Sequence, residues 1–128
     1  MAVSTMDIAW MAGLLEGEAC FCIGRRKVKN KEYKRVLISL VMTDHDVMRK
    51  AGKLFGAEPA PLKPAKLSTK PLWRLSICGT RAIEWMMTIY PLMGERRQNK
   101  ISQCIAAWKA SPGKSRRRRN TYAGSEVT

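Results

Sequence analysis

The sequence feature that most constrains the fold is a pair of neighbouring segments in which apolar residues alternate with polar or small ones. The two segments are CFCIGRRKV (20–28) and KRVLISLVM (34–42), and they are joined by the charged loop KNKEY (29–33). A period of two predicts β-strands, and a short polar connection predicts that the strands pair as an antiparallel hairpin. Because one side of such a hairpin is apolar, the fold must supply a second layer that covers it.

The rest of the chain predicts four helices and two further strands. Thr5 and Thr43 stand where they can cap the first two helices, and Gly56 stands where it can end the second. The expected order is helix, strand, strand, helix, strand, strand, helix, helix, which indicates an α+β fold with one antiparallel sheet backed by helices. The helices are expected at 5–18, from Thr43 to Gly56, from Gly79 to Pro91 and from Glu95 to Ser111, with an irregular edge strand within 60–67 and a firmer strand at 72–78.

Length and charge indicate one basic domain with a basic tail. The chain has 128 residues, 24 Lys and Arg against 10 Asp and Glu, and a net charge of +14. The expected domain is 1–112, and the expected flexible tail is 113–128. Because the tail holds only five of the basic residues, the domain remains strongly positive without it. A positive domain favours a polyanionic partner, with nucleic acid ahead of an anionic membrane surface.

Neither a membrane segment nor a secretory signal is evident in the sequence. No run approaches eighteen apolar residues, and the first residues lack the basic, apolar, small-residue order of a signal peptide. The four cysteines form no CxxC pair and are accompanied by a single histidine, His45, which favours reduced thiols over a zinc site. The expectation is an intracellular, cytoplasmic protein with no membrane partner.

Strand alternation separates an apolar side of the sheet from a small, polar or basic side. The second side is either a solvated surface or a surface that binds nucleic acid, and the excess of Arg and Lys around the hairpin favours nucleic acid. The residues predicted to contact it are Cys22, Gly24, Arg25, Arg26, Lys27, Lys29, Lys34, Arg35, Leu37, Ser39, Lys66, Arg74 and Ser76.

Two glycines in the first predicted helix need an explanation, because glycine weakens a helix by about 1 kcal/mol relative to alanine. Gly13 and Gly17 stand four residues apart and share one face, which ends at Glu18. The bare face serves either internal packing or the close approach of a second copy. Two copies would bring two Glu18 carboxylates together, and these repel unless a hard cation such as Mg²⁺ lies between them.

The stretch MAGLLEGEA (11–19) resembles the signature motif of the LAGLIDADG homing endonucleases. Ala12, Gly13 and Leu14 match it outright; Met11 stands for Leu, Leu15 for Ile, Glu16 and Glu18 for the two acids, and Gly17 for Ala. Ala19 departs from the glycine that usually closes the motif. The stretches CFCIGRRK, ISLVMTDHDVMRKAGKLFG and YPLMGERRQNKI also resemble the family, so the similarity spans about 5–110.

The resemblance implies a saddle-shaped sheet on DNA and a homodimer, because the chain carries one motif. It implies an interface that contains Ala12, Gly13, Glu16 and Gly17. By position, Glu18 corresponds to the acid that ligates the metal and contacts the scissile phosphate, with two or more Mg²⁺ shared between the two copies. Arg96 corresponds to a basic residue that stabilises negative charge or orders water, and Asp44 to a polar residue near the catalytic water.

The function that follows is site-specific, metal-dependent double-strand cleavage of DNA by phosphodiester hydrolysis, typical of a mobile-element homing enzyme. Three other functions are open. They are a non-cleaving DNA-binding regulator of the same fold, an RNA-binding protein that assists splicing, and an unrelated basic structural protein.

Overall fold

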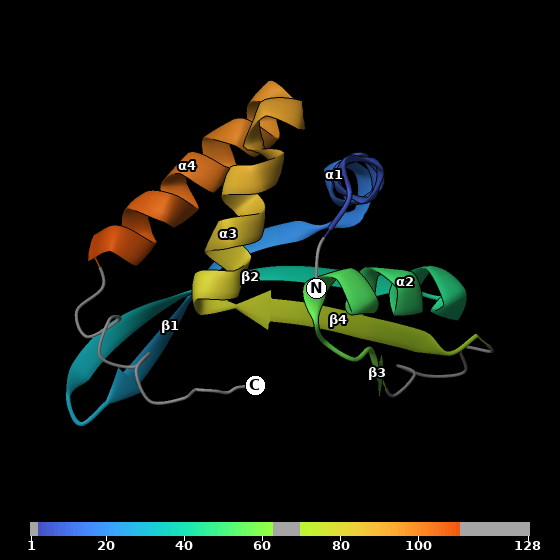
Figure 1. Ribbon diagram of the computed structural model, residues 1–128. Helices are drawn as coiled ribbons and strands as arrows, with labels where there is room; N and C mark the ends of the chain where they lie inside the picture. The colour runs from blue at the N-terminus through green and yellow to red at the C-terminus, as the bar shows by residue number, and fades with distance from the viewer. Residues whose placement is uncertain (1–2, 63–69, 111–128) are drawn as a thin grey trace.

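The computed structural model describes residues 3–62 and 70–110, which form one antiparallel sheet with helices on one side (Figure 1). The four strands lie in the order β1-β2-β4-β3. The α+β fold predicted from the sequence is therefore confirmed. In chain order the elements are α1 (Thr5–Glu18), β1 (Cys20–Val28), β2 (Lys31–Met42), α2 (His45–Phe55), β3 (Ala60–Leu62), β4 (Leu72–Cys78), α3 (Gly79–Ile89), the 3₁₀ helix η1 (Tyr90–Leu92) and α4 (Glu95–Ala110).

The β1–β2 hairpin is longer than the sequence indicated. β2 begins at Lys31 rather than at Lys34, because the chain reverses in a two-residue turn at Lys29 and Asn30. These residues have φ values of +50° and +66°, the left-handed conformation that two-residue hairpin turns require. The turn escaped prediction because Lys-Asn lacks the glycine that usually marks it. As a result, the hairpin extends well beyond the helices at the lower left of Figure 1.

The helix starts differ from the predicted caps by one residue each. The N-cap of α1 is Ser4 rather than Thr5: the Ser4 hydroxyl accepts a hydrogen bond of 3.0 Å from the Asp7 N–H, and Asp7 accepts one from the Ser4 N–H. The cap position of α2 is Asp44 rather than Thr43, and its side chain makes no capping hydrogen bond. β3 forms at the sheet edge, and the remainder of the predicted irregular strand lies outside the described residues.

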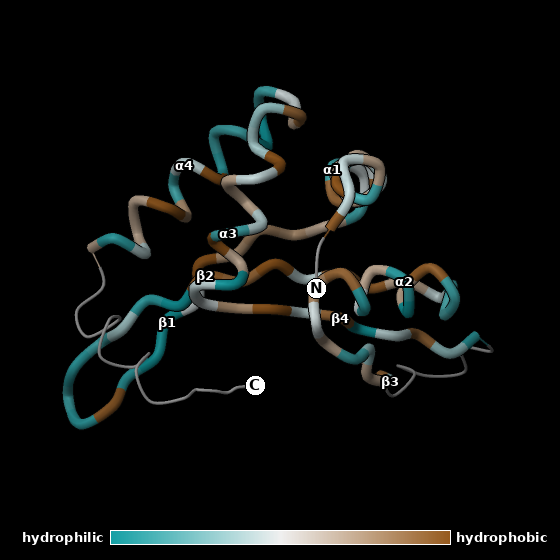
Figure 2. Tube along the Cα trace, in the orientation of Figure 1, coloured by the Kyte–Doolittle hydropathy of each residue, from teal (hydrophilic) through white to brown (hydrophobic). Residues whose placement is uncertain are grey.

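The core lies between the apolar face of the sheet and the helices, as strand alternation predicted. Figure 2 shows hydrophobic residues along β2 and β4 beneath the helices, and hydrophilic residues towards the hairpin tip. Burial of alternate residues leaves the opposite face of each strand outside the core. The fully buried core residues include Val36, Ile38, Leu40 and Leu75 from the sheet, and Met11, Leu15, Met48, Met86, Ile89 and Ile101 from the helices.

A glycine inside α2 is required by the turn that follows the helix. A Cβ atom added to Gly52 would stand 2.5 Å from the carbonyl oxygen of Ala57, which is backbone and cannot move aside cheaply. The same glycine carbonyl accepts hydrogen bonds from the N–H groups of Gly56 and Ala57, at 2.7 and 2.9 Å, so the helix end is folded tightly back on this position.

Gly52→Ala is therefore expected to destabilise the protein by about 1–3 kcal/mol, the usual cost of overpacking, although alanine is the better helix former. Urea unfolding followed by circular dichroism measures the change. Ser102→Ala, on the exposed side of α4, is the matched control and is expected to change stability by less than about 0.5 kcal/mol. A Gly52→Ala protein as stable as the control would contradict the steric argument.

Candidate functional site

The face of the sheet opposite the helices is open, and the strand register brings its residues together in rows. Cys22 pairs with Leu37, which pairs in turn with Cys78 on β4; Ser39 pairs with Ser76 in the neighbouring row. All of these side chains are exposed or half-buried. The open face is thus a floor of mostly small or polar side chains across three strands, with Leu37 among them.

Three arginines stand on this open face, one from each of its long strands. Arg26 belongs to β1, Arg35 to β2 and Arg74 to β4, and all three are exposed. Arg35 is held towards β4, because its Nη2 donates to the Sγ of Cys78 at 3.5 Å. Since cationic side chains at these positions interleave with small residues, the floor has the positive charge that suits a nucleic-acid backbone.

The other basic residues predicted for this floor lie elsewhere. Arg25 pairs with Lys34 in the register, so both of them and Lys27 point to the side of the hairpin opposite Arg26 and Arg35. Arg25 is also 3.6 Å from the carboxylate of Glu32. Lys29 lies in the hairpin turn itself. Lys66 lies outside the described residues, as do the residues of the predicted tail from 113 to 128.

The glycine face of α1 is exposed, and no segment within residues 3–62 and 70–110 packs against Gly13 or Gly17. A Cβ added at Gly13 or Gly17 would meet no atom within 4 Å beyond the helix's own backbone. Along the same face, Met6 is 80% exposed and Ala9 is also exposed. Met6, Ala9, Gly13 and Gly17 therefore form one exposed apolar stripe along α1. Met6 and Ala9 were missed in the sequence, because the motif begins after them.

The two other residues predicted for an interface on α1 are engaged within their own chain. Ala12 is only 4% exposed and belongs to the core, so the prediction that its side chain faces a partner does not agree with the structure. Glu16 is half-buried, and its Oε1 accepts a hydrogen bond of 2.9 Å from the N–H of Gly94, just before α4. A carboxylate in this position also faces the positive end of the α4 dipole.

Glu18 is the last residue of α1, and its side chain is exposed at the end of the stripe. Ala19 follows it and is 5% exposed, so the methyl group that replaces the usual glycine is accommodated in the core. Within residues 3–62 and 70–110, no group of three or more His, Cys, Asp or Glu side chains is placed to hold a metal ion. One chain therefore offers a single free carboxylate at this point.

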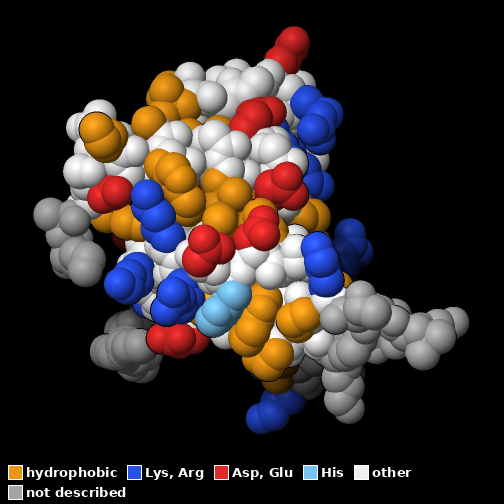
Figure 3. All heavy atoms as spheres, turned by 90° about the vertical axis from the view of Figure 1, so that its right-hand side faces the viewer, with side chains coloured by type: hydrophobic (Ala, Val, Ile, Leu, Met, Phe, Trp, Pro, Cys, Tyr) orange, Lys and Arg blue, Asp and Glu red, His pale blue; other side chains and the backbone are white. Residues whose placement is uncertain are grey.

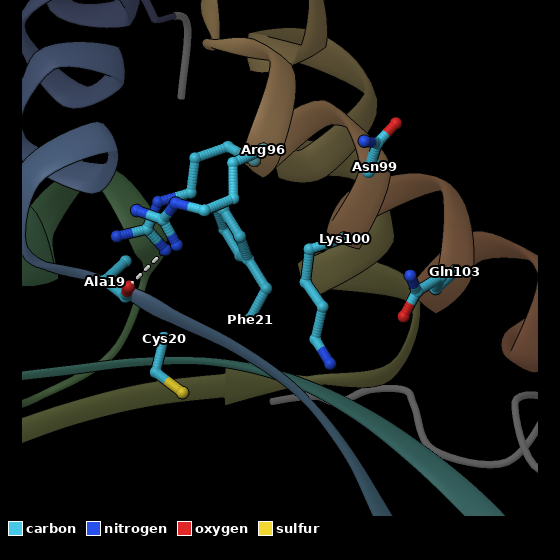
Figure 4. Close-up of a pocket in the computed structure, with 8 residues that line it drawn as sticks. Ala19, Cys20, Phe21, Arg96, Asn99, Lys100 and Gln103 are labelled. Carbon is cyan, nitrogen blue, oxygen red and sulfur yellow. Dashed lines mark hydrogen bonds between the residues drawn. The ribbon is translucent and has the colours of Figure 1, made fainter.

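A cleft of about 480 Å³ lies between the start of β1 and the first turns of α4 (Figure 4). Its walls are Ala19, Cys20, Phe21, Arg96, Arg97, Asn99, Lys100 and Gln103. Arg96 is exposed, and Lys100 lies one turn further along the same helix. Both cations therefore border the chain segment that leaves Glu18.

Arg97, which the sequence analysis did not single out, connects α4 with the end of α1. Nη1 of Arg97 donates a hydrogen bond to the carbonyl oxygen of Ala19, and its guanidinium lies 5.4 Å from the centre of the Phe21 ring. Two adjacent arginines at a helix start cannot be told apart in a sequence. Both line the cleft, and only packing shows that Arg97 is half-buried and holds the end of α1 while Arg96 is exposed.

Arg97→Ala is expected to lower the free energy of unfolding by about 1–3 kcal/mol, because it leaves the Ala19 carbonyl without its charged donor. Arg96→Ala, one position earlier in the same helix, is expected to change it by less than about 0.5 kcal/mol. Thermal unfolding of the two variants beside the wild type makes the comparison. Equal stabilities would contradict the structural role of Arg97.

Asp44 is exposed at the point where β2 ends and α2 begins. The next residue, His45, stacks on Trp73 of β4 with ring centres 4.0 Å apart, which fixes the start of α2 to the sheet. Figure 3 views the molecule from the side where β2 ends, and acidic side chains gather near the middle of that face beside the histidine.

No described helix combines the length and the apolar character needed to cross a bilayer. The chain matches no protein-family model, and it matches no curated protein.

Solved structures do resemble the chain. The homing endonuclease I-CvuI, in complex with the I-CreI target, superposes with a TM-score of 0.63 at 16% identity, over 85% of this chain and 70% of that one. The group I intron-encoded homing endonuclease I-CeuI, complexed with DNA, gives 0.63 at 17% identity over 85% and 56%. The LAGLIDADG homing endonuclease I-LtrWI, bound to target DNA, gives 0.57 at 16% identity over 85% and 45%. The chain therefore spans between 45% and 70% of the length of these three proteins, and its fold is that of the LAGLIDADG homing endonucleases.

Proposed function

We propose that this protein is a site-specific DNA endonuclease that hydrolyses phosphodiester bonds in both strands, with Mg²⁺, as a homodimer. The observation that carries the proposal is the exposed apolar stripe of α1, whose two glycines meet no described segment and which ends in the exposed carboxylate of Glu18. Nothing in the described chain accounts for two exposed glycines in one helix, whereas close approach of a second α1 does.

A second copy would supply the second carboxylate that one chain lacks. Two α1 helices in contact along Gly13 and Gly17 would bring both Glu18 residues to the bottom of the interface, beside the open faces of the two sheets. Each copy supplies one free carboxylate, and paired carboxylates with DNA phosphates and water form the all-oxygen environment that Mg²⁺ prefers. The donor set therefore fits this metal. When bound, Mg²⁺ would neutralise charge on the reacting phosphate and lower the pKa of a bound water.

Side chains near Glu18 would take the other roles in the proposed reaction. Arg96 and Lys100, which border the cleft beside Ala19, would stabilise the negative charge that develops on the phosphate during hydrolysis. Asp44 would accept a hydrogen bond from a water and so orient it. Arg97 and Glu16 would hold the end of α1 in position, through the contacts with Ala19 and Gly94.

The sheet floor would receive the duplex. Its arginines Arg26, Arg35 and Arg74 project from three adjacent strands, and arginine is the side chain that most often reads guanine in the major groove. The relatives I-CvuI, I-CeuI and I-LtrWI were each solved with DNA, which supports this partner.

Binding to DNA is expected to weaken by about 10³-fold between 50 and 200 mM salt, because phosphate contacts release counterions. Arg74→Ala is expected either to reduce the salt slope by about one or to relax sequence preference at one position. Arg49→Ala, on the exposed side of α2 and so on the helix side of the sheet, is the control and is expected to change neither. Fluorescence anisotropy over a salt series measures both. A larger change in DNA binding for Arg49→Ala than for Arg74→Ala would mean that the DNA lies on the helix side of the sheet, and would contradict the proposal.

The test of function is cleavage of the DNA that surrounds the protein's own gene, with purified protein and Mg²⁺. The expected result is a double-strand cut at one site that requires the metal. Specific binding without any cut, in Mg²⁺ or Mn²⁺, would favour a regulator of the same fold. Preference for RNA over duplex DNA would favour a splicing role.

A further inference from the structure

One row of side chains across the open face of the sheet is apolar. Cys22, Leu37 and Cys78 lie side by side on β1, β2 and β4, because Leu37 pairs with both cysteines in the strand register. Cys78 is exposed, and the other two side chains are half-buried. Since residues paired across strands share a face, the three form one continuous apolar row on the side of the sheet opposite the helices.

The neighbouring rows on the same face are polar or bare. On one side Ser39 pairs with Ser76, and on the other side Gly24 pairs with Arg35. A Cβ atom added to Gly24 would stand 3.6 Å from Cδ1 of Leu37, so the leucine lies directly beside the bare glycine. Leu37 is therefore a large apolar side chain in the middle of the floor, bordered by hydroxyl groups on one side and by a cation on the other.

The apolar row is poorly suited to the hydrogen bonds by which proteins recognise guanine, adenine or cytosine. Leucine has no polar side-chain atom, and a thiol is only a weak donor and a weak acceptor. Burial and the hydrogen bond to Cys20 raise the pKa of Cys22 to about 11, so this thiol is neutral at neutral pH. The group in the major groove that suits such a surface is the C5 methyl of thymine, because it is apolar.

The dimensions of the row fit the major groove. Two strand spacings of about 4.8 Å place the outer members about 10 Å apart, and the groove is about 12 Å wide. Successive rows on one face are about 6.8 Å apart, the rise of about two base pairs. Arg35 stands one row from Leu37, and its Nη2 donates to the Sγ of Cys78 at 3.5 Å. A guanine read by Arg35 would therefore lie within about two base pairs of a base above Leu37.

We propose that Leu37, flanked by Cys22 and Cys78, selects thymine in the target DNA by contact with its methyl group, within about two base pairs of a guanine read by Arg35. The inference rests on the proposed DNA partner and names the base that the centre of the floor prefers. Deoxyuridine lacks only that methyl group. Its substitution for the thymine is expected to weaken binding about fourfold, the effect of losing one buried carbon of this size.

The experiment starts with the full chain and a library of random duplex DNA, bound in Ca²⁺ and sequenced after repeated selection. The wild type is expected to enrich a site with thymine within about two base pairs of guanine. Each such thymine is then replaced in turn by deoxyuridine, and fluorescence anisotropy compares the two duplexes. The expected result for the wild type is binding about fourfold weaker at one of these positions.

Three variants locate the discrimination. Leu37→Ala is expected to bind the thymine and deoxyuridine duplexes equally. Leu37→Gln is expected to prefer adenine at that position, because glutamine pairs with N6 and N7 of adenine. Leu92→Gln changes an exposed leucine on η1, on the helix side of the sheet, and is the matched control expected to keep the wild-type discrimination. Circular dichroism verifies that all variants are folded.

Three results would overturn this inference alone, while specific binding still supports the proposed function. The first is equal binding of thymine and deoxyuridine by the wild type at every position tested. The second is wild-type discrimination by Leu37→Ala. The third is loss of discrimination in Leu92→Gln. A library in which no sequence is enriched would contradict the proposed function itself, and this inference with it.

Discussion

Glu18→Gln is expected to abolish DNA cleavage, with a rate loss of roughly 10³-fold or more, while binding to the target in Ca²⁺ persists. Metal-ion stabilisation of a phosphoryl transition state is worth several kcal/mol, and each 1.36 kcal/mol is a factor of ten in rate. The amide keeps the size of the side chain but removes the charge that holds the cation. Since Glu18 is exposed at a helix end and outside the core, the fold is expected to be unaffected.

Single-turnover cleavage with Mg²⁺, beside anisotropy in Ca²⁺, separates the two effects. Glu84→Gln is the matched control: it is an exposed glutamate on α3, and the same change there is expected to leave the cleavage rate unaltered. Cleavage by Glu18→Gln near the wild-type rate would remove Glu18 from the metal site. A parallel loss of binding would instead assign Glu18 to DNA recognition.

Gly13→Leu is expected to yield a folded monomer that neither cleaves DNA nor binds a full target site tightly. A leucine at the centre of the exposed stripe adds four carbons where two backbones must touch, and overpacking of a close contact costs about 1–3 kcal/mol. A displacement of about 1 Å at a reacting centre can cost roughly 100-fold in rate. In the isolated chain the new side chain meets open space, so folding is expected to be preserved.

Multi-angle light scattering with and without DNA, in parallel with the cleavage assay, tests this expectation. Ala106→Leu places the same side chain on the exposed side of α4 and is expected to change neither assembly nor cleavage. A wild-type protein that stays monomeric even on DNA would contradict the shared site. A Gly13→Leu protein that dimerises and cuts would show that the glycines serve some other purpose.

The candidate site was only partly predictable from sequence. The motif identified Glu18 as an acid at the end of an exposed helix face, and alternation identified the floor arginines Arg26, Arg35 and Arg74. Alternation also separates these from Arg25, Lys27 and Lys34, but the charge cluster at the hairpin tip obscured the separation. The strand register shows which residues lie on which face, because residues paired across two strands must share a face.

Contacts between distant segments could not be predicted at all. Glu16 and Gly94 are 78 positions apart, and so are Ala19 and Arg97. Nothing local marks either pair, because a hydrogen bond across the fold leaves no periodicity in the sequence. The same is true of Ala12, whose place in the core rather than at a surface depends on which way α1 is rotated against the sheet.

The sequence by itself determined the type and order of the elements and the two-sided character of the sheet, because these depend on local periodicity and on boundary residues such as Gly56. The tertiary structure alone decided which of two adjacent arginines faces inward, which acid is free and which is bound, and that the glycines of α1 are left bare. These outcomes depend on the packing of α1 and α4 against the sheet. Packing is set by the fit of many side chains at once, so no single stretch of the chain encodes it.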